Sequence, residues 1–320
     1  MKDIVIGIDL GGTNIKAGAV SPTGTILFHQ STPTNAAQGP EAVADRIAEA
    51  ALQCRDGVPN GRQRTAGIGI GSPGTIDLGK GIVQFSPNLP GWTDIPLRDM
   101  VEKRTGLPCV LENDANAAAL GEQWVGAGRG TSSVVIFTLG TGIGGGIVLD
   151  GKVWHGFNGV AAEIGHMSID PHGPKCGCGN TGCIEAYASA TAMVRRMKEA
   201  IASGQRTSLA ARGDRLTAKD IYDAATAGDK AARENMQETG RYLGVAISNI
   251  MHILNPEVVV LSGGVTAAGD MLMRPILEEV DKRTLEASRR NVQVLFARLG
   301  DDAGVIGTAR CFMMSARMPG

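Results

Sequence analysis

Three cysteines and a histidine lie close together in a glycine-rich stretch of the sequence, between residues 163 and 185. Cys176, Cys178 and Cys183 fall within eight residues, and His166 precedes the first of them by ten. Three thiolates and one imidazole are a donor set that structural Zn²⁺ prefers. Clustered Cys and His in an intracellular chain indicate a metal site more often than three reduced cysteines in a loop. The sequence therefore predicts a zinc site made by these four side chains.

Carboxylates lie beside this cluster and also in a second segment, LENDANAAALGE. Glu163 precedes His166, and Glu185 follows Cys183, so a metal would fix both at the wall of a site. In the segment LENDANAAALGE, Asp114 ends a strand and turn and opens a helix, beside Asn113. A carboxylate there could take a proton from a substrate hydroxyl. The alternative is that Asp114 only caps its helix.

Three glycine-rich loops have the composition of phosphate-binding turns. They are DLGGT at residues 9–13, LGTGIGGG at 139–146 and LSGG at 261–264. Backbone N–H groups in such turns can bind phosphate, and Thr13 and Thr141 add hydroxyl donors. Asp9, at the end of the first strand, could hold Mg²⁺. GTGIGG also matches G-x-G-x-x-G, but a strand rather than a helix follows it, so a dinucleotide-binding fold is not indicated. Ordinary β-turns are the alternative for each loop; together the three predict one nucleotide site.

Length and composition exclude several classes of protein. A chain of 320 residues has room for about two domains. The net charge of −1 argues against nucleic acid as the main partner, and six cysteines of which three are clustered do not form a disulfide framework. The uncharged run 131–149 has the length of a membrane span, but its glycine-rich centre favours two strands around a turn. No signal peptide is visible, so we expect a cytoplasmic protein without a membrane anchor.

The hydrophobic pattern predicts alternating strands and helices. Strands are expected at 4–10, 15–20, 25–29, 65–71, 109–111, 257–261 and 292–296, and helices at 41–54, 95–105, 114–124, 191–203, 218–227, 230–254, 271–286 and 303–313. A polar loop is expected between residues 71 and 95. The pattern of strand, Gly/Thr turn, strand, turn and strand in IDLGGTNIKAGAVSPTGTIL returns in FTLGTGIGGGIVLDGKVW. This repeat predicts two α/β domains of related topology flanking a cleft.

With these motifs in place, the chain resembles the ROK family (repressors, open reading frames, sugar kinases) over essentially its whole length. The matching motifs are DLGGT at 9–13, ENDANAAALGE at 112–122, LGTGIGGGI at 139–147, EIGH at 163–166, CGCGNTGCIE at 176–185 and LSGGV at 261–265. The resemblance implies the two-domain, actin-like or hexokinase-type ATPase fold, built from ribonuclease H-like domains with the active site between them. We expect a small domain of residues 1–112 and 302–320, and a large domain of residues 113–301 that carries the zinc loop.

The resemblance extends to bacterial glucokinases, and it implies transfer of phosphate from ATP to the 6-hydroxyl of glucose. Asp114 matches the catalytic base. The expected sugar-binding residues are Gly74, Asn88, Asn113, Asp114, Glu163, His166 and Glu185. The expected nucleotide-binding residues are Asp9, Gly11, Gly12, Thr13, Asn14, Thr141, Gly142, Gly144, Gly263 and Gly264. ATP, Mg²⁺ and a structural Zn²⁺ on His166, Cys176, Cys178 and Cys183 are the implied cofactors.

Several alternatives stay open at this point. The chain could phosphorylate N-acetylmannosamine, N-acetylglucosamine, mannose or fructose, because the hydroxyl-binding residues are shared within the family. A sugar-responsive repressor is a second alternative, but the first expected strand begins at Ile4 and leaves no room for a DNA-binding segment before it. A nucleic-acid zinc module is a third, and the near-neutral charge argues against it. The expected partners are a sugar and ATP, with neither nucleic acid nor membrane, in a homodimer or homotetramer.

Overall fold

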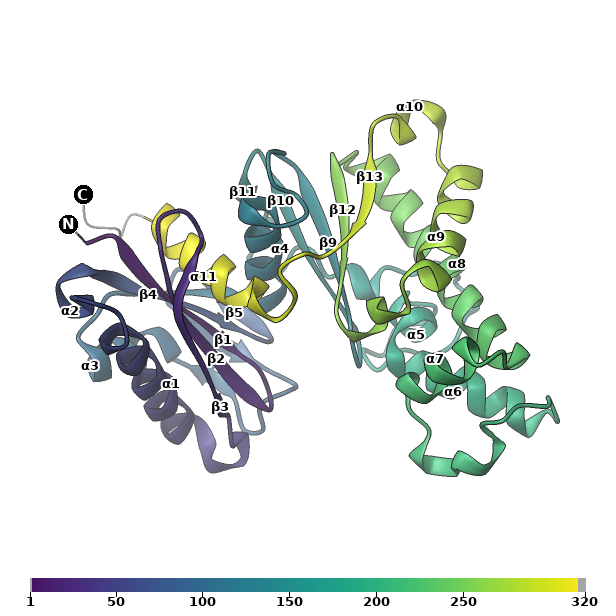
Figure 1. Cartoon of the computed structure of the whole chain (residues 1–320), viewed down its shortest axis with the longest axis horizontal. Coiled ribbons are helices and arrows are strands. Elements are labelled where there is room, and N and C mark those ends of the chain that lie inside the picture. Colours follow the sequence, from purple (N-terminus) through teal and green to yellow (C-terminus); the bar gives the residue numbers. More distant parts are fainter. Residues whose placement is uncertain (1, 316–320) are drawn as a thin grey trace. The chain divides into compact units, whose positions relative to one another are not determined.

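The computed structural model describes residues 2–315 and contains two five-stranded sheets (Figure 1). The first has the order β3-β2-β1-β4-β8, and the second has the order β11-β10-β9-β12-β13. The strands of the first sheet are β1 (Ile4–Leu10), β2 (Asn14–Val20), β3 (Ile26–Pro33), β4 (Thr65–Ser72) and β8 (Cys109–Asn113). Those of the second are β9 (Val134–Leu139), β10 (Ile143–Leu149), β11 (Lys152–Val153), β12 (Val258–Ser262) and β13 (Gln293–Phe296). Each repeat of three strands occupies the same place in its sheet, which confirms the predicted duplication.

The chain divides into two compact units. The first comprises Met1–Val134, Gly146–Ala162 and Ala297–Gly320, and the second comprises Val135–Gly145 and Glu163–Phe296. The domain boundaries expected from the sequence, at 112/113 and 301/302, stay a prediction. The uncharged run 131–149 forms β9 and β10, as predicted, and no helix among the described residues is long and apolar enough to cross a membrane.

In the first unit, β1 is covered on both faces. Ile4, Ile6 and Ile8 share a buried cluster with α1 (Gly39–Asp56), whereas Val5 belongs to a cluster with α11 (Ala303–Met314). Successive side chains of a strand point to opposite faces of its sheet, so an unbroken apolar run is what a strand covered on both sides requires. The pattern IVIGIDL therefore already specifies a central strand.

Glycines line the face of this sheet that meets α11. A Cβ at Gly7 would lie 1.9 Å from the Val305 carbonyl oxygen, and one at Gly69 would lie 1.9 Å from that of Thr308. Such distances are far inside van der Waals contact, so α11 lies directly on the backbone of β1 and β4. On its other side α11 meets α4 (Asp114–Val125), where a Cβ at Gly307 would lie 1.7 Å from the Ala117 carbonyl oxygen.

Three short strands lie within the segment between residues 71 and 95, so the expectation of one polar loop there is wrong. β5 (Thr75–Asp77), β6 (Ile82–Phe85) and β7 (Thr93–Ile95) form a three-stranded antiparallel sheet. Each strand has three or four residues, too few for a clear alternating pattern. The helix expected from residue 95 begins two residues later, as α3 (Leu97–Thr105), because Ile95 pairs with Val83.

Helices make up about half of the second unit. They are α5 (Glu185–Ala188), α6 (Ala190–Ala202), α7 (Ala218–Thr226), α8 (Lys230–Ile253), α9 (Asp270–Arg283) and α10 (Glu286–Arg289). Figure 1 shows α8 beside α9, and a Cβ at Gly240 would lie 2.9 Å from the Leu272 carbonyl oxygen. The helix expected at 271–286 ends three residues earlier, as α9, because Thr284 is extended.

The close approach of α11 to the first sheet can be tested at Gly69. In Gly69→Ala, the added methyl group has no space because backbone atoms surround it, and we expect a loss of about 3 kcal/mol or more in the free energy of unfolding. Urea unfolding followed by circular dichroism measures this loss. Gly79→Ala is the matched control, since a Cβ there would meet only the Asp77 carboxylate at 3.5 Å. Equal midpoints for the two variants would contradict the packing described above.

Candidate active site

Two carboxylates of the first unit influence each other. Asp9 lies near the end of β1, and Asp114 begins α4. The pKa of Asp9 is raised to about 6, first by burial and then by the negative charge of Asp114, while Lys16 opposes the shift. A raised carboxylate pKa from burial and a second acid is common at functional sites. The arrangement gives a strong local negative potential, which suits a divalent cation.

Asn113, rather than Asp114, is the N-cap residue of α4. Its side-chain oxygen accepts hydrogen bonds from the backbone N–H groups of Ala115 at 3.0 Å and Asn116 at 3.1 Å, and its amide donates to the Gly74 carbonyl oxygen at 3.3 Å. Asp114 Oδ1 accepts a further hydrogen bond from Ala115 at 2.8 Å. The view that Asp114 serves only as the helix cap is therefore weakened, because a better-placed residue performs that role.

The turn between β1 and β2 contains Gly11, Gly12 and Thr13, and Asn14 begins β2. The Gly11 N–H donates to the Asn14 carbonyl oxygen at 2.9 Å, and the Gly11 carbonyl accepts from the Thr34 hydroxyl at 2.6 Å. Gly12 has an exposed backbone, and a Cβ there would lie 3.1 Å from the carbonyl oxygen of Asn88. The structure thus brings the predicted sugar-loop residue Asn88 next to the predicted phosphate turn.

In the second unit, Glu185 connects the turn between β9 and β10 to α5. Its Oε2 accepts a hydrogen bond from the Ile143 N–H at 2.9 Å, and a Cβ at Gly142 would lie 2.3 Å from the same oxygen. The carbonyl of Thr141 accepts from the Thr191 hydroxyl at 2.8 Å. Gly142 is therefore required where the carboxylate approaches the turn, and one carboxylate oxygen of Glu185 is already used in holding it.

Gly263 and Gly264 follow β12. Gly263 has φ +94°, in the left-handed region that favours glycine, and a Cβ there would lie 2.4 Å from the Leu139 carbonyl oxygen. Gly264 has open space around it. The second unit therefore places the LSGG loop beside the end of β9, where the Thr141 turn begins.

The four predicted zinc ligands come together in the second unit. One donor atom from each of His166, Cys176, Cys178 and Cys183 lies within 4.8 Å of every other. The sulfurs of Cys178 and Cys183 are 3.7 Å apart, and the Cys176 sulfur is 3.8 Å from His166 Nδ1. Tetrahedral zinc with bonds of about 2.3 Å to sulfur needs two sulfurs about 3.8 Å apart. The donor set therefore fits this ion.

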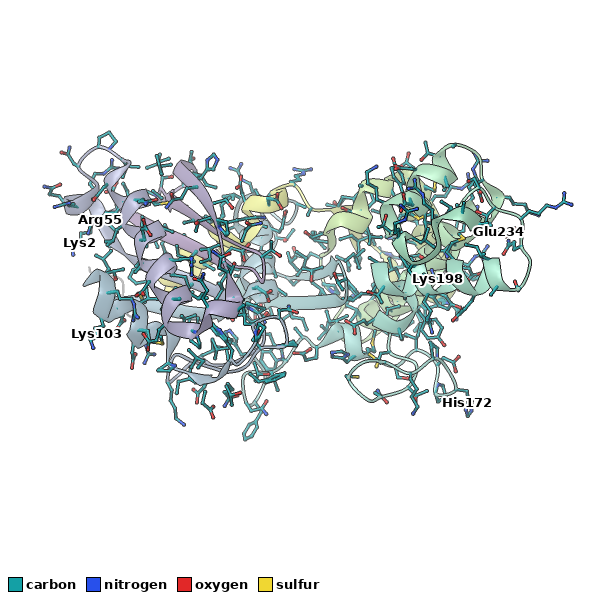
Figure 2. The ribbon with its side chains drawn as sticks, turned by 90° about the horizontal axis from the view of Figure 1, so that it is seen from below. Lys2, Arg55, Lys103, His172, Lys198 and Glu234 are labelled. Carbon is teal, nitrogen blue, oxygen red and sulfur yellow. The ribbon has the colours of Figure 1, made fainter. Side chains whose placement is uncertain are left out.

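The other ring nitrogen of His166 faces a carboxylate. Nε2 lies 3.9 Å from Glu163 Oε2, so His166 directs one nitrogen to the cluster and the other toward a predicted sugar-binding residue. His172, in the same loop, is exposed and lies at the surface of the second unit (Figure 2). Of the two histidines in the loop, the sequence pattern selected the one whose nitrogen meets the cysteines.

Three features of the first unit did not follow from the sequence motifs. Lys16, opposite Asp9 in the β1–β2 ladder, pairs with Asp301 at 2.8 Å. Glu122 is fully buried and accepts hydrogen bonds from the backbone N–H groups of Ala127, Arg298 and Leu299 at 2.7 to 3.2 Å. Glu112 is buried beside His155. Glu112 and Glu122 are the first and last residues of the motif ENDANAAALGE, so this motif was the sequence signal that pointed to them.

The duplicated sheet, with a Gly/Thr turn after the first strand of each copy, defines an α/β protein of the actin-like ATPase class. The ROK family model matches residues 5–314, and the chain belongs to the ROK family. The glucokinase of Thermotoga maritima is 43% identical over 308 residues, 95% of this chain and 96% of that protein. The glucokinase of Halalkalibacterium halodurans is 42% identical over 306 residues, 94% of this chain and 92% of that protein.

Solved structures of the family have the same fold. A ROK family glucokinase from Streptomyces griseus, in complex with glucose and AMPPNP, is 38% identical with a TM-score of 0.80, covering 96% of this chain and 98% of that one. The ROK hexokinase from Thermus thermophilus is 35% identical with a TM-score of 0.80, covering 96% of both chains. The fold class expected from the sequence is confirmed.

The raised pKa of Asp9 predicts a pH-dependent cost to stability. The unfolded carboxyl titrates near 3.8 and the folded one near 6, so stability falls as the pH rises through this interval. At pH 7.5, the free energy of unfolding of Asp9→Asn should therefore exceed that of wild type by about 1–3 kcal/mol, and the variant should unfold at a higher temperature. Below pH 4 the two proteins should not differ. Thermal unfolding without Mg²⁺ or nucleotide measures this. The exposed control Asp99→Asn should show no such difference; a less stable Asp9→Asn at pH 7.5 would contradict the prediction.

Proposed function

We propose that this chain is an ATP-dependent glucokinase that phosphorylates the 6-hydroxyl of glucose. The observation that carries the proposal is the identity of 42–43% to two curated glucokinases over at least 92% of every chain compared. The glucose and AMPPNP bound to the related structure supply the substrate class and the nucleotide. The paired carboxylates of Asp9 and Asp114 supply groups that such a reaction needs.

Asp114 is the proposed general base. A sugar hydroxyl is a poor nucleophile at neutral pH, and a carboxylate can take its proton as the phosphoryl group arrives. Gly74, Asn88, Asn113, Glu163, His166 and Glu185 are the proposed groups that bind the sugar. Asn113 already holds the start of α4 through two backbone hydrogen bonds, so it also fixes the position of the residue that follows it.

The glycine turns are the proposed nucleotide site. Their residues are Gly11, Gly12, Thr13 and Asn14 in the first unit, and Thr141, Gly142, Gly144, Gly263 and Gly264 in the second. Backbone N–H groups and threonine hydroxyls of such turns bind phosphate oxygens. Asp9 would hold Mg²⁺ directly or through water, and the cation supplies charge neutralisation on the phosphates.

The cysteine cluster is the proposed structural zinc site. Four protein ligands leave no position for a reacting water, so the metal would stabilise the loop rather than take part in the chemistry. The same loop leads into Glu185, and His166 also faces Glu163. A cytoplasmic location and a homodimer or homotetramer also remain proposals.

A panel of sugars with ATP and Mg²⁺, followed by ADP release, tests the reaction, and Asp114→Asn tests the base. Glucose should have the highest kcat/KM among glucose, mannose, fructose, N-acetylglucosamine and N-acetylmannosamine.

In Asp114→Asn, kcat should fall by about 10²–10⁴ while calorimetry still detects glucose binding, because an amide keeps the hydrogen bonds but accepts no proton. Near-normal turnover in a folded Asp114→Asn protein would exclude the base assignment.

Zinc occupancy has a separate test. Freshly purified protein, never exposed to chelator, should contain one zinc per chain by elemental analysis. Cys176→Ser should lower the zinc content and the thermal stability together and should raise the KM for glucose, because the cluster orders the loop that carries Glu185. Cys54→Ser is a control for zinc content alone, which it should leave unchanged, since Cys54 lies in the core of the first unit, whereas the cysteines of the cluster belong to the second. Wild-type protein without zinc would contradict the assignment.

A further inference from the structure

A buried carboxylate lies immediately before the two residues that open α4. Glu112 is 6% exposed, and its Oε1 accepts hydrogen bonds from the Asn113 N–H at 2.9 Å and the Asn116 side-chain amide at 3.3 Å. The second oxygen, Oε2, lies 2.8 Å from His155 Nε2. Burying a charge is costly unless it is paired and hydrogen-bonded, so these partners are needed to keep Glu112 where it is.

His155 belongs to the segment that follows β11. Its backbone carbonyl accepts a hydrogen bond from the Ala161 N–H at 3.2 Å, which closes the loop 155–161 on itself. A Cβ at Gly159, within this loop, would lie 3.4 Å from the Ile76 carbonyl oxygen of β5. The chain then continues through Ala162 directly into Glu163. The His155 side chain therefore attaches the base of this loop to the end of β8.

The charges of Glu112 and His155 stabilise the hydrogen bond between them. The hydrogen bond to Glu112 raises the pKa of the His155 imidazole above its usual value of 6.5, against the lowering effect of burial. A charge-assisted hydrogen bond to a buried carboxylate is stronger than a neutral one. Both groups lie in the first compact unit, so the link is internal to it.

We propose that His155, acting through Glu112, is a positioning residue for the sugar side of the reaction. The pair joins the loop that leads into Glu163 to the strand end that carries Asn113 and Asp114. Glu112 restrains the start of α4 through Asn113 and Asn116, and His155 restrains the loop. This inference rests on the proposed function, because Glu163, Asn113 and Asp114 are sugar-side residues only if the chain is a sugar kinase.

Kinetics of His155→Ala and His155→Gln test the proposal. Removal of the imidazole should raise the KM for glucose about tenfold, the effect of losing one hydrogen bond to a charged group, while the KM for ATP changes less than twofold. Gln places a donor nitrogen at a similar reach, so His155→Gln should restore most of the glucose KM. The control His29→Ala removes an exposed histidine from β3 and should behave as wild type. Wild-type glucose KM in His155→Ala, or no recovery in His155→Gln, would overturn the proposal.

A double-mutant cycle with Glu112→Ala, which removes every acceptor that faces His155, separates this role from a general loss of stability. If His155 acts through Glu112, adding His155→Ala to Glu112→Ala should raise the glucose KM less than twofold further. Additive effects of the two substitutions would mean that the residues act independently, which would contradict the proposed pairing.

Hydrogen exchange of the unliganded proteins provides a measurement that needs no activity. Backbone amides of residues 154–162 should exchange faster in His155→Ala than in wild type, and His155→Gln should lie near wild type. Unchanged exchange in His155→Ala would show that the link does not hold the loop. A wild-type protein inactive on every sugar would contradict the proposed function, whereas an active wild type with an unaffected His155→Ala would contradict this inference alone.

Discussion

The close packing of α11 on backbone is the constraint on which the first unit depends. Gly7 and Gly69 carry no side chain on the strand face that meets α11, and Gly307 carries none on the helix face that meets α4. Interiors are packed to the density of organic crystals, so a helix that rests on backbone has no alternative register. Asp9 meets the first turn of α11, where a Cβ at Gly304 would lie 2.7 Å from the Asp9 carboxyl carbon. The position of Asp9 and that of α4 are therefore set by the same helix.

Buried carboxylates hold this packing at both ends of α4. Glu112 precedes the helix and receives donors from its first turn, while Glu122 near its other end receives backbone donors from the connection that enters α11. Each acid accepts hydrogen bonds from several N–H groups at once, and a carboxylate has two acceptor oxygens where the amide of the same size has one. In the motif ENDANAAALGE, the proposed base Asp114 thus lies, in sequence, between two acids whose carboxylates are already hydrogen-bonded.

In the second unit, side-chain hydrogen bonds likewise hold α5, a short helix that follows the cysteine cluster. Tyr187 of α5 donates to the Asp170 carboxylate at 2.9 Å, and Arg195 and Arg196 donate to backbone carbonyls of the same helix. A helix of four residues has little stability of its own. Its position, and with it that of Glu185, therefore depends on these side-chain contacts and on the cysteine loop that precedes it.

The sequence by itself determined the features that depend on local spacing. The apolar runs of β1 and β4, the Gly/Thr turns that reveal the duplication, and the order of His166 and the three cysteines were all predictable, because each is a pattern within a few residues. The short strands β5 to β7 were not predictable, since three or four residues carry too weak a periodicity. Nor were the long-range hydrogen bonds of buried acids: Glu112 and His155 are 43 positions apart, and Glu122 and Arg298 are 176 apart. Only the packing of sheet and helices brings such groups together, because a carboxylate selects its partners by distance in space and leaves no periodic trace in the chain.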